Sequence, residues 1–258
     1  MINNLPSSIL VLDTETISID KAFIYDLGYI VAKLDTETLQ YVAVERSQEI
    51  ISQIYDNKPL FETAYYSNKR KIYTSLMKGR TAKKNKFGYA LQKLKHTIKE
   101  HNITHVFAYN SNFDFRAVQQ TADLFKAQNT LKDLMWVDIL AVANHYIHQT
   151  THYTTYAGQN GWINASGYIQ TNAEKTYAFL TKNPDYVEPH TSLQDCEIEL
   201  EILNACVLRG WNNESDYKKR FIASDKKQTL TIKTGDKEYS FSYTKRINRK
   251  NGEIVLTK

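Results

Sequence analysis

Cysteine is scarce in this chain, which has only two cysteines among 258 residues. Two thiols cannot form the disulfide framework of a small secreted domain. Cys196 and Cys206 lie ten residues apart in one predicted helix. At 1.5 Å per residue this is about 15 Å, which is too far for a bond. We therefore expect a protein of the reducing cytoplasm.

Long apolar runs are also missing. No apolar stretch approaches the ~18–20 residues that a membrane-spanning helix needs. The first six residues contain no basic region followed by an apolar run, so they do not read as a secretory signal. No repeat of 20–50 residues and no low-complexity tract is visible. With 42% hydrophobic and 24% charged residues, the composition predicts a folded protein with a full core and no membrane partner.

Positive charge is concentrated in two segments. The net charge is +5, yet residues 216–258 contain 12 Lys and Arg against 5 Asp and Glu, a balance of +7, which leaves −2 for the remainder. Residues 69–86 add eight Lys or Arg and no acid. Either segment could guide a polyanion such as nucleic acid. The alternatives are a solvated surface or, for the C-terminal segment, a docking site for a partner such as a DNA polymerase or another replication protein.

The hydrophobic pattern predicts an α/β protein. Strands are expected at residues 8–12, 24–33, 41–45, 104–108 and 135–140. Helices are expected at residues 61–78, 87–101, 114–125, 141–147, 172–180 and 191–208. Because strands come first as a meander and then alternate with helices, we predict a mixed five-stranded sheet flanked by helices. We expect residues 1–210 to form this domain and residues 211–258 to form a small, basic, β-rich C-terminal extension.

A long polar segment, residues 148–170, is predicted to be a loop. Its aromatic residues could stack on nucleic-acid bases or pack the loop down; they are Tyr153, Tyr156, Trp162 and Tyr168. Three histidines lie in or near it: His145, His148 and His152. Without cysteine or a clear inward face we read these histidines as polar loop residues rather than zinc ligands.

Two carboxylates end the first predicted strand. Asp13 and Glu15 are two residues apart, so a strand's period of two places them on one face. Such a pair repels unless a cation joins it, and hard ions such as Mg²⁺ or Mn²⁺ prefer oxygen ligands. The same Leu-Asp-Thr-Glu-Thr sequence recurs at residues 34–38. The second copy joins two strands and is predicted to be a solvated turn.

Two further acids and a histidine fall at predicted helix starts. Asp114 follows the fourth strand, where the helix dipole alone would favour a carboxylate. His190 and Asp195 open the helix at residues 191–208, where a capping box is an alternative role. Asp195 precedes Ile198 and Ile202 by three and seven residues, so it shares their inward face. A buried acid requires a partner, and a metal ion would be one.

Together these residues resemble a known family. Three segments are similar to the three motifs of the DEDDh (DnaQ-like) 3′→5′ exonucleases. They are Leu12-Asp13-Thr14-Glu15-Thr16, Asn110-Ser111-Asn112-Phe113-Asp114, and His190 placed five residues before Asp195. The resemblance covers residues 8–208, and the long polar loop and the C-terminal tail look most like those of phage-encoded members. Tyr109 stands where many members have histidine. The DEDDy branch would place tyrosine four residues before the last acid, and here that residue is Thr191.

The resemblance implies a ribonuclease H-like fold and an exonuclease domain at residues 1–210. It implies two divalent ions, Mg²⁺ or Mn²⁺, held by Asp13, Glu15, Asp114 and Asp195, with His190 as the general base. Thr14, Thr16, Asn110, Asn112 and Phe113 are the expected substrate contacts. The substrate would be a single-stranded DNA 3′ end, cleaved to nucleoside 5′-monophosphates in proofreading or DNA processing. Alternatives are a 3′→5′ exoribonuclease and a non-catalytic nucleic-acid-binding module.

Overall fold

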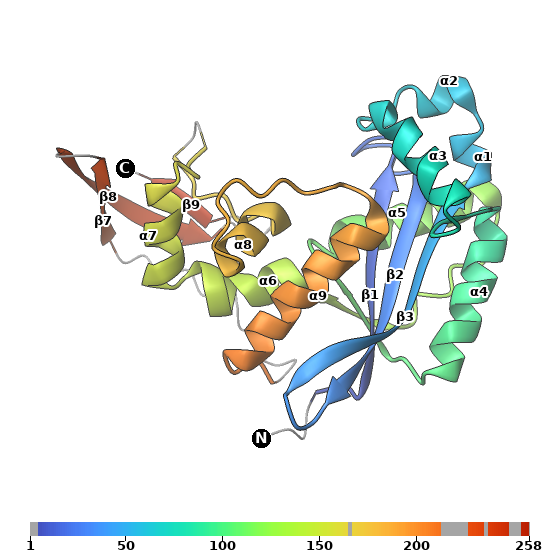
Figure 1. Ribbon diagram of the computed structural model, residues 1–258, viewed down its shortest axis with the longest axis horizontal. Coiled ribbons are helices and arrows are strands. Elements are labelled where there is room, and N and C mark those ends of the chain that lie inside the picture. Colours follow the sequence, from blue (N-terminus) through green and yellow to red (C-terminus); the bar gives the residue numbers. More distant parts are fainter. Residues whose placement is uncertain (1–4, 165–166, 213–226, 235–236, 248–253, 258) are drawn as a thin grey trace. The chain divides into compact units, whose positions relative to one another are not determined.

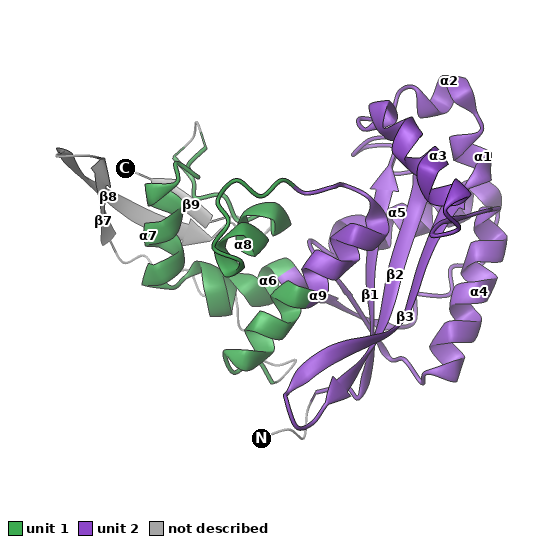
Figure 2. Ribbon diagram, viewed as in Figure 1, with its two compact units in different colours: residues 1–4, 140–187, 201–258 green, residues 5–139, 188–200 purple. Residues whose placement is uncertain are grey.

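The chain folds into two compact units in a computed structural model (Figure 2). The structure describes residues 5–164, 167–212, 227–234, 237–247 and 254–257. Unit 2 comprises residues 5–139 and 188–200, and unit 1 comprises residues 1–4, 140–187 and 201–258. No helix in the described residues is long and apolar enough to cross a membrane.

Unit 2 is built on a mixed sheet of six strands in the order β4-β3-β2-β1-β5-β6 (Figure 1). The strands are β1 Ser8–Thr16, β2 Ile24–Asp35, β3 Gln40–Ile51, β4 Lys83–Asn85, β5 His105–Ala108 and β6 Met135–Asp138. The first three form an antiparallel meander. The pairs β1–β5, β5–β6 and β3–β4 are parallel. The fold class is therefore the predicted mixed α/β sheet flanked by helices.

The sheet has one strand more than the five predicted. Strand β4 is three polar residues long and pairs in parallel with the end of β3 at Glu49–Ile51. Its sequence, Lys-Lys-Asn, has no apolar alternation, so no hydrophobic pattern could have identified it. Only the position of β3 beside it makes this segment a strand.

The helices of unit 2 are α1 Ser52–Tyr55, α2 Lys58–Phe61, the 3₁₀ turn η1 Ser67–Lys69, α3 Arg70–Lys78, α4 Phe87–Glu100 and α5 Asn112–Phe125. Helices α4 and α5 match the predictions at residues 87–101 and 114–125, whereas α1 was not predicted. The single helix predicted at residues 61–78 is instead interrupted, since α2 ends at Phe61 and a helix resumes only at Ser67. Helix α9, Ser192–Leu208, begins in unit 2.

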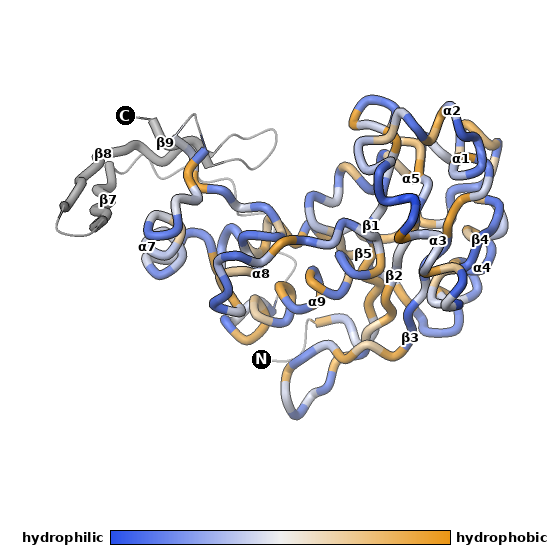
Figure 3. The backbone as a smooth tube through the Cα atoms, turned by 45° about the horizontal axis from the view of Figure 1, so that its top comes forward, coloured by the Kyte–Doolittle hydropathy of each residue, from blue (hydrophilic) through white to orange (hydrophobic). Residues whose placement is uncertain are grey.

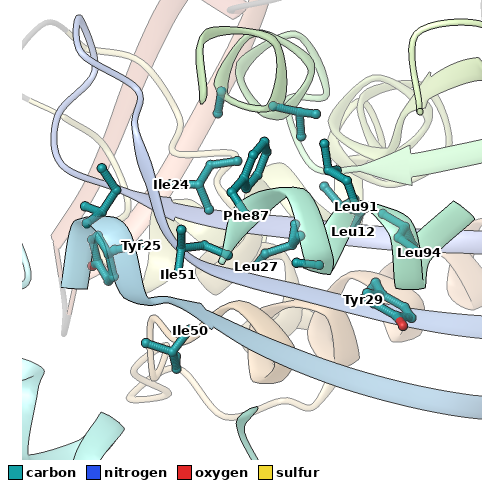
Figure 4. Packing of buried hydrophobic residues seen from close by; sticks show 14 of the residues in the cluster. Leu12, Ile24, Tyr25, Leu27, Tyr29, Ile50, Ile51, Phe87, Leu91 and Leu94 are labelled. Atoms are coloured by element: carbon teal, nitrogen blue, oxygen red, sulfur yellow. The ribbon is translucent and has the colours of Figure 1, made fainter. Parts of the chain in front are cut away.

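The core lies between the sheet and the helices α4 and α5. Leu12 of β1 and Leu27 of β2 pack in one buried cluster with Phe87, Leu91 and Leu94 of α4 (Figure 4). Each such buried side chain contributes about 1.5–3 kcal/mol. Hydrophobic residues accordingly gather along the middle of the sheet near β2 and β5 (Figure 3).

Unit 1 contains more helix than the polar sequence predicted. Its helices are the end of α6 Ile139–Ala143, the π-helix η2 Asn144–His148, α7 Thr151–Gln159, α8 Ala173–Leu180 and the end of α9. The prediction of a loop over residues 148–170 was therefore wrong for α7. Thr150 caps this helix by accepting from the Tyr153 N–H, and Tyr153 inside the helix is fully buried. Because most residues of α7 are polar, its narrow apolar face gives only a weak helical pattern in the sequence.

The histidine and aromatic side chains of this segment divide between the interior and the surface, and His145 and His152 are exposed as predicted. His148 is buried and contacts Asn144 at 2.5 Å and Thr176 at 2.8 Å, so it is not a polar loop residue. Tyr153 and Trp162 are buried as well, and only Tyr156 and Tyr168 are half-exposed. Of the two predicted roles, base stacking or packing of the segment, Tyr153 and Trp162 adopt packing.

The C-terminal part forms a second sheet, as predicted. Strands β7 Lys227–Thr234, β8 Lys237–Ile247 and β9 Ile254–Thr257 pair antiparallel in the order β7-β8-β9. These strands lie within the β-rich extension predicted at residues 211–258. Residues 213–226, 235–236, 248–253 and 258 of that extension lie outside the described residues.

Candidate active site and metal centre

The end of strand β1 places two carboxylates on one face of the sheet. Asp13 pairs with Gly28 of β2, and Glu15 pairs with Asp26. Leu10 and Leu12 belong to the core on the opposite face, under α4 and α5. Because side chains alternate along a strand, Asp13 and Glu15 point away from that core. The predicted shared face is confirmed.

Helix α9 begins directly over this face. A Cβ atom added at Gly28 would lie 2.4 Å from the carbonyl carbon of Ser192 and 2.5 Å from the nitrogen of Leu193, so only glycine permits this approach. The Ser192 N–H donates to Asp26 Oδ2 at 3.1 Å. The first turn of α9 is thus fixed above the strand pair that carries Asp13 and Glu15.

This crossing brings three predicted site residues together. One ligand atom from each of Glu15, His190 and Asp195 lies within 4.8 Å of the other two. Glu15 and Asp195 are buried, at 8% and 5% exposure, whereas the His190 side chain is 30% exposed. The arrangement is two buried carboxylates with a partly solvated imidazole beside them.

Asp114 joins the site from the start of α5. It is 2% exposed, and its Oδ1 accepts a hydrogen bond of 2.7 Å from the Thr14 hydroxyl on β1. The turn that leads into α5 is sharp, since Asn110 has φ +63° and its N–H donates to Asp138 Oδ1 at 2.9 Å. Asp138 is the last residue of β6, which pairs in parallel with β5. The ends of these two strands therefore fix the turn that leads to Asp114.

The carboxylates are electrostatically unfavourable to one another. Burial, followed by the charges of Asp114 and of acids on α9, raises the pKa of Asp13 well above its usual value. Burial raises the pKa of Asp114 to about 7. For Asp195, burial and then the charges of Glu188 and Asp26 raise the pKa to about 8, against the lowering effect of Lys69. Burial and Asp195 raise the pKa of Glu15 in the same direction.

A fifth acid, Glu199, was not predicted from the sequence. It is 2% exposed, and burial followed by the charge of Asp114 raises its pKa well above the usual value. Its charge also raises the pKa of Asp13. The sequence feature that could have identified Glu199 is its position four residues after Asp195, because residues four apart lie on one face of a helix. We call Asp13, Glu15, Asp114, Asp195 and Glu199 the acid cluster.

The acid cluster fits divalent cations. Oδ1 of Asp195 and Oε2 of Glu199 are buried and have no hydrogen-bond partner within the described part of the chain. Burying unpaired carboxylate oxygens is costly unless a cation or proton accompanies them. The positive charge of Lys69 lowers the pKa of Glu15 and Asp195, yet burial keeps both values raised. Hard divalent ions such as Mg²⁺ or Mn²⁺ would match these oxygen ligands.

The predicted substrate contacts lie on β1 and in the segment that opens α5, which also carry acids of this site. Thr14 donates its hydroxyl to Asp114, and Thr16 donates to the Ser18 carbonyl at 3.3 Å. Asn110 and Asn112 are exposed, and Phe113 is partly buried against the core. A substrate role for these five residues stays a prediction.

The second Leu-Asp-Thr-Glu-Thr copy is the predicted turn. Asp35 ends β2 and its Oδ1 accepts from the Glu37 N–H at 2.8 Å and the Thr38 N–H at 3.4 Å. These hydrogen bonds lower the pKa of Asp35. Identical sequences therefore have opposite electrostatics, because one copy is covered by α9 and the other faces solvent.

Known structures share this architecture. A crystal structure of an SSB/exonuclease I complex with the inhibitor CFAM aligns with a TM-score of 0.51 at 14% sequence identity, over 83% of this chain and 44% of that chain. The chain has the fold of exonuclease I. At this identity the likeness establishes the ribonuclease H-like fold alone.

Two further exonuclease I structures align less closely. Escherichia coli exonuclease I with a dA16 oligonucleotide has a TM-score of 0.48 at 13% identity, covering 98% of this chain and 55% of that chain. A product-bound exonuclease I has a TM-score of 0.48 at 15% identity, covering 83% and 46%. This chain thus spans about half the length of the exonuclease I chains. The sequence matches no protein-family model and no curated protein.

Proposed function

We propose that this protein is a metal-dependent 3′→5′ exonuclease of the DEDDh family that hydrolyses single-stranded DNA to nucleoside 5′-monophosphates. The observation that carries the proposal is the convergence of Glu15, His190 and Asp195 within 4.8 Å, beside Asp13 and Asp114. Three segments far apart in the sequence meet there in the order that the family motifs predict. The exonuclease I fold supports the same reading.

The acid cluster would hold the cations. Asp13, Glu15 and Asp114 come from β1 and α5, and Asp195 completes the set from α9. Two divalent ions at such a site would stabilise the charge that develops on the entering and leaving oxygens of a phosphodiester. The Thr14 hydroxyl donates to Oδ1 of Asp114 and so fixes the orientation of this carboxylate.

His190 would act as the general base. Its imidazole is partly solvated beside Glu15 and Asp195, so water can reach it. An imidazole can accept a proton from an attacking water near neutral pH. Glu188 Oε2 lies 3.5 Å from His190 Nδ1 and would stabilise the protonated ring until the proton leaves.

The preference for DNA over RNA is part of the proposal. A partner protein bound by the extension at residues 211–258, a role in proofreading and a phage origin stay predictions. The division at residue 210 likewise stays a proposal.

The test is digestion of a 5′-labelled single-stranded DNA oligonucleotide and of its RNA twin, with Mg²⁺ or Mn²⁺ and with EDTA. We expect a ladder that shortens from the 3′ end only in the presence of metal, faster on DNA. Faster RNA digestion would identify an exoribonuclease. Intact oligonucleotide in every metal, with binding retained in a gel shift, would leave a binding module.

The chain contains its own matched control. Asp13→Asn is expected to reduce the rate by more than the ~10–100-fold that loss of an outer metal partner costs. Asp35→Asn makes the same change in the same five-residue sequence, at the turn. It should leave the rate unchanged. Equal rates in the two variants would show that the cleavage comes from another site or another protein.

A further inference from the structure

The side chain of His190 is stacked on Tyr66. The two ring centroids are 4.6 Å apart and the planes differ by 18°. Tyr66 lies just before the 3₁₀ turn η1, far from the three predicted motifs. Burial, followed by the charge of Glu15, raises the pKa of Tyr66 to about 12, so the phenol is neutral beside the acid cluster. One face of the imidazole is therefore covered by an uncharged ring.

Lys69, one turn later, holds the backbone at the same place. Its Nζ donates to the Pro189 carbonyl at 2.5 Å and to the His190 carbonyl at 3.5 Å. The same ammonium lies 4.2 Å from the centroid of the Tyr66 ring, within cation–π distance. The Lys69 N–H donates to the Tyr66 carbonyl at 2.9 Å, which ties both residues into one turn.

The backbone of His190 needs such support. Its φ is +51°, in the left-handed region that few non-glycine residues occupy. A conformation of this kind costs on the order of 1–3 kcal/mol and persists only where the surroundings hold it. The contacts from Tyr66 and Lys69 act on the ring and on the two adjoining carbonyls, which together set where the imidazole points.

We propose that Tyr66 and Lys69 are positioning residues for His190. Tyr66 covers one face of the imidazole, and Lys69 fixes the carbonyls of Pro189 and His190. Glu188 contacts Nδ1 from the same segment. The ring is thereby held beside Glu15 and Asp195 before substrate binds. The catalytic meaning of this device rests on the proposed function, whereas the placement of the ring does not.

The kinetic test uses two substitutions at Tyr66 and one control substitution at an exposed tyrosine of α4. Tyr66→Ala is expected to lower kcat on the order of 10- to 100-fold, with KM nearly unchanged, because a misplaced base slows chemistry rather than binding. Tyr66→Phe keeps the stack and should restore kcat. Tyr89→Ala removes an aromatic ring of α4 that is 59% exposed and should have no effect. Wild-type kcat in Tyr66→Ala would overturn the proposal.

A spectroscopic test needs no substrate. The full chain labelled on histidine has seven imidazoles, and His190 is assigned by the signal missing from His190→Gln. A stacked ring shifts the His190 ring protons upfield. In Tyr66→Ala they should move towards the shifts of His96, whose side chain is 81% exposed, and in Tyr66→Phe they should stay.

The same measurement examines Lys69. Lys69→Met should move the His190 signals, whereas Lys71→Met, at an exposed site two residues later, should not. If the wild type digests no nucleic acid, the proposed function fails, but these spectra still decide whether the ring is positioned as described. Unmoved His190 signals in both Tyr66→Ala and Lys69→Met would overturn the positioning role.

Discussion

The backbone of Ser192 lies against Gly28 so closely that a Cβ at Gly28 would be 2.4 Å from the Ser192 carbonyl carbon. Gly28 is also the pairing partner of Asp13 across β1 and β2. One glycine thus sets the distance between the strand that carries Asp13 and Glu15 and the helix that carries Asp195. The geometry of the acid cluster depends on the absence of a side chain there.

Gly28→Ala should therefore damage both stability and the metal site. The added methyl group meets backbone, which cannot rotate away, so we expect a loss of about 1–3 kcal/mol or more and a displaced first turn of α9. Thermal unfolding and Mn²⁺ titration measure the two effects. Gly88→Ala is the control, because nothing lies within 4 Å of its Cβ position and alanine suits helix α4. Equal stability of the two variants would contradict the crowding.

The pH dependence of metal-free stability should run opposite to that of an ordinary acid pair. The pKa values of Asp114 and Asp195 are raised to about 7 and about 8, whereas unfolded aspartate titrates near ~3.9. The folded state therefore binds more protons between these values, and stability falls as pH rises from about 4 through 8. In EDTA, we expect the melting temperature to decrease over this range.

Divalent cations should reverse that trend. Mn²⁺ or Mg²⁺ replaces the protons, so binding should release them and raise the melting temperature most at high pH. Calorimetric titration in two buffers of different ionisation enthalpy counts the released protons. A heat of binding that is independent of the buffer would mean that the acid cluster is already ionised.

Glu199→Gln should stabilise the metal-free protein. It removes a buried carboxylate that repels Asp13 and Asp114 and whose Oε2 has no hydrogen-bond partner in the described residues. We expect about 1 kcal/mol or more in EDTA, roughly 2–4 °C in melting temperature, and a smaller gain on adding Mn²⁺. Glu197→Gln, two residues earlier and 51% exposed, should change neither value appreciably. A lower melting temperature for Glu199→Gln in EDTA would be the contrary result.

His148→Ala should destabilise unit 1 without affecting cleavage. The imidazole is buried between Asn144 and Thr176, so its loss leaves a cavity and unpaired polar groups, which cost about 2–4 kcal/mol. His152→Ala, at an exposed site one turn later, should stay within ~0.5 kcal/mol. Unfolding with and without a zinc chelator checks the role, since a chelator that lowers the melting temperature would indicate a metal rather than a hydrogen-bond network.

The sequence by itself was sufficient to predict the helices and strands that have a clear hydrophobic pattern. Strand β1 could be predicted because an unbroken apolar run ends at Asp13, and α4 because Leu91, Leu94 and Ile98 recur at helical spacing. Asp13, Glu15, Asp114, His190 and Asp195 could be selected because each lies at the end of such an element. Strand β4 and helix α7 could not be predicted, since their polar residues carry almost no periodicity.

Only the tertiary structure decided how those residues meet. Two identical five-residue sequences differ because α9 covers Asp13 while Asp35 faces solvent. Glu199 and Tyr66 join the site through helix packing and a turn that no motif contains. The reason is physical: periodicity reports which face of an element is buried, whereas the partner of that face is set by long-range packing, which a one-dimensional pattern does not encode.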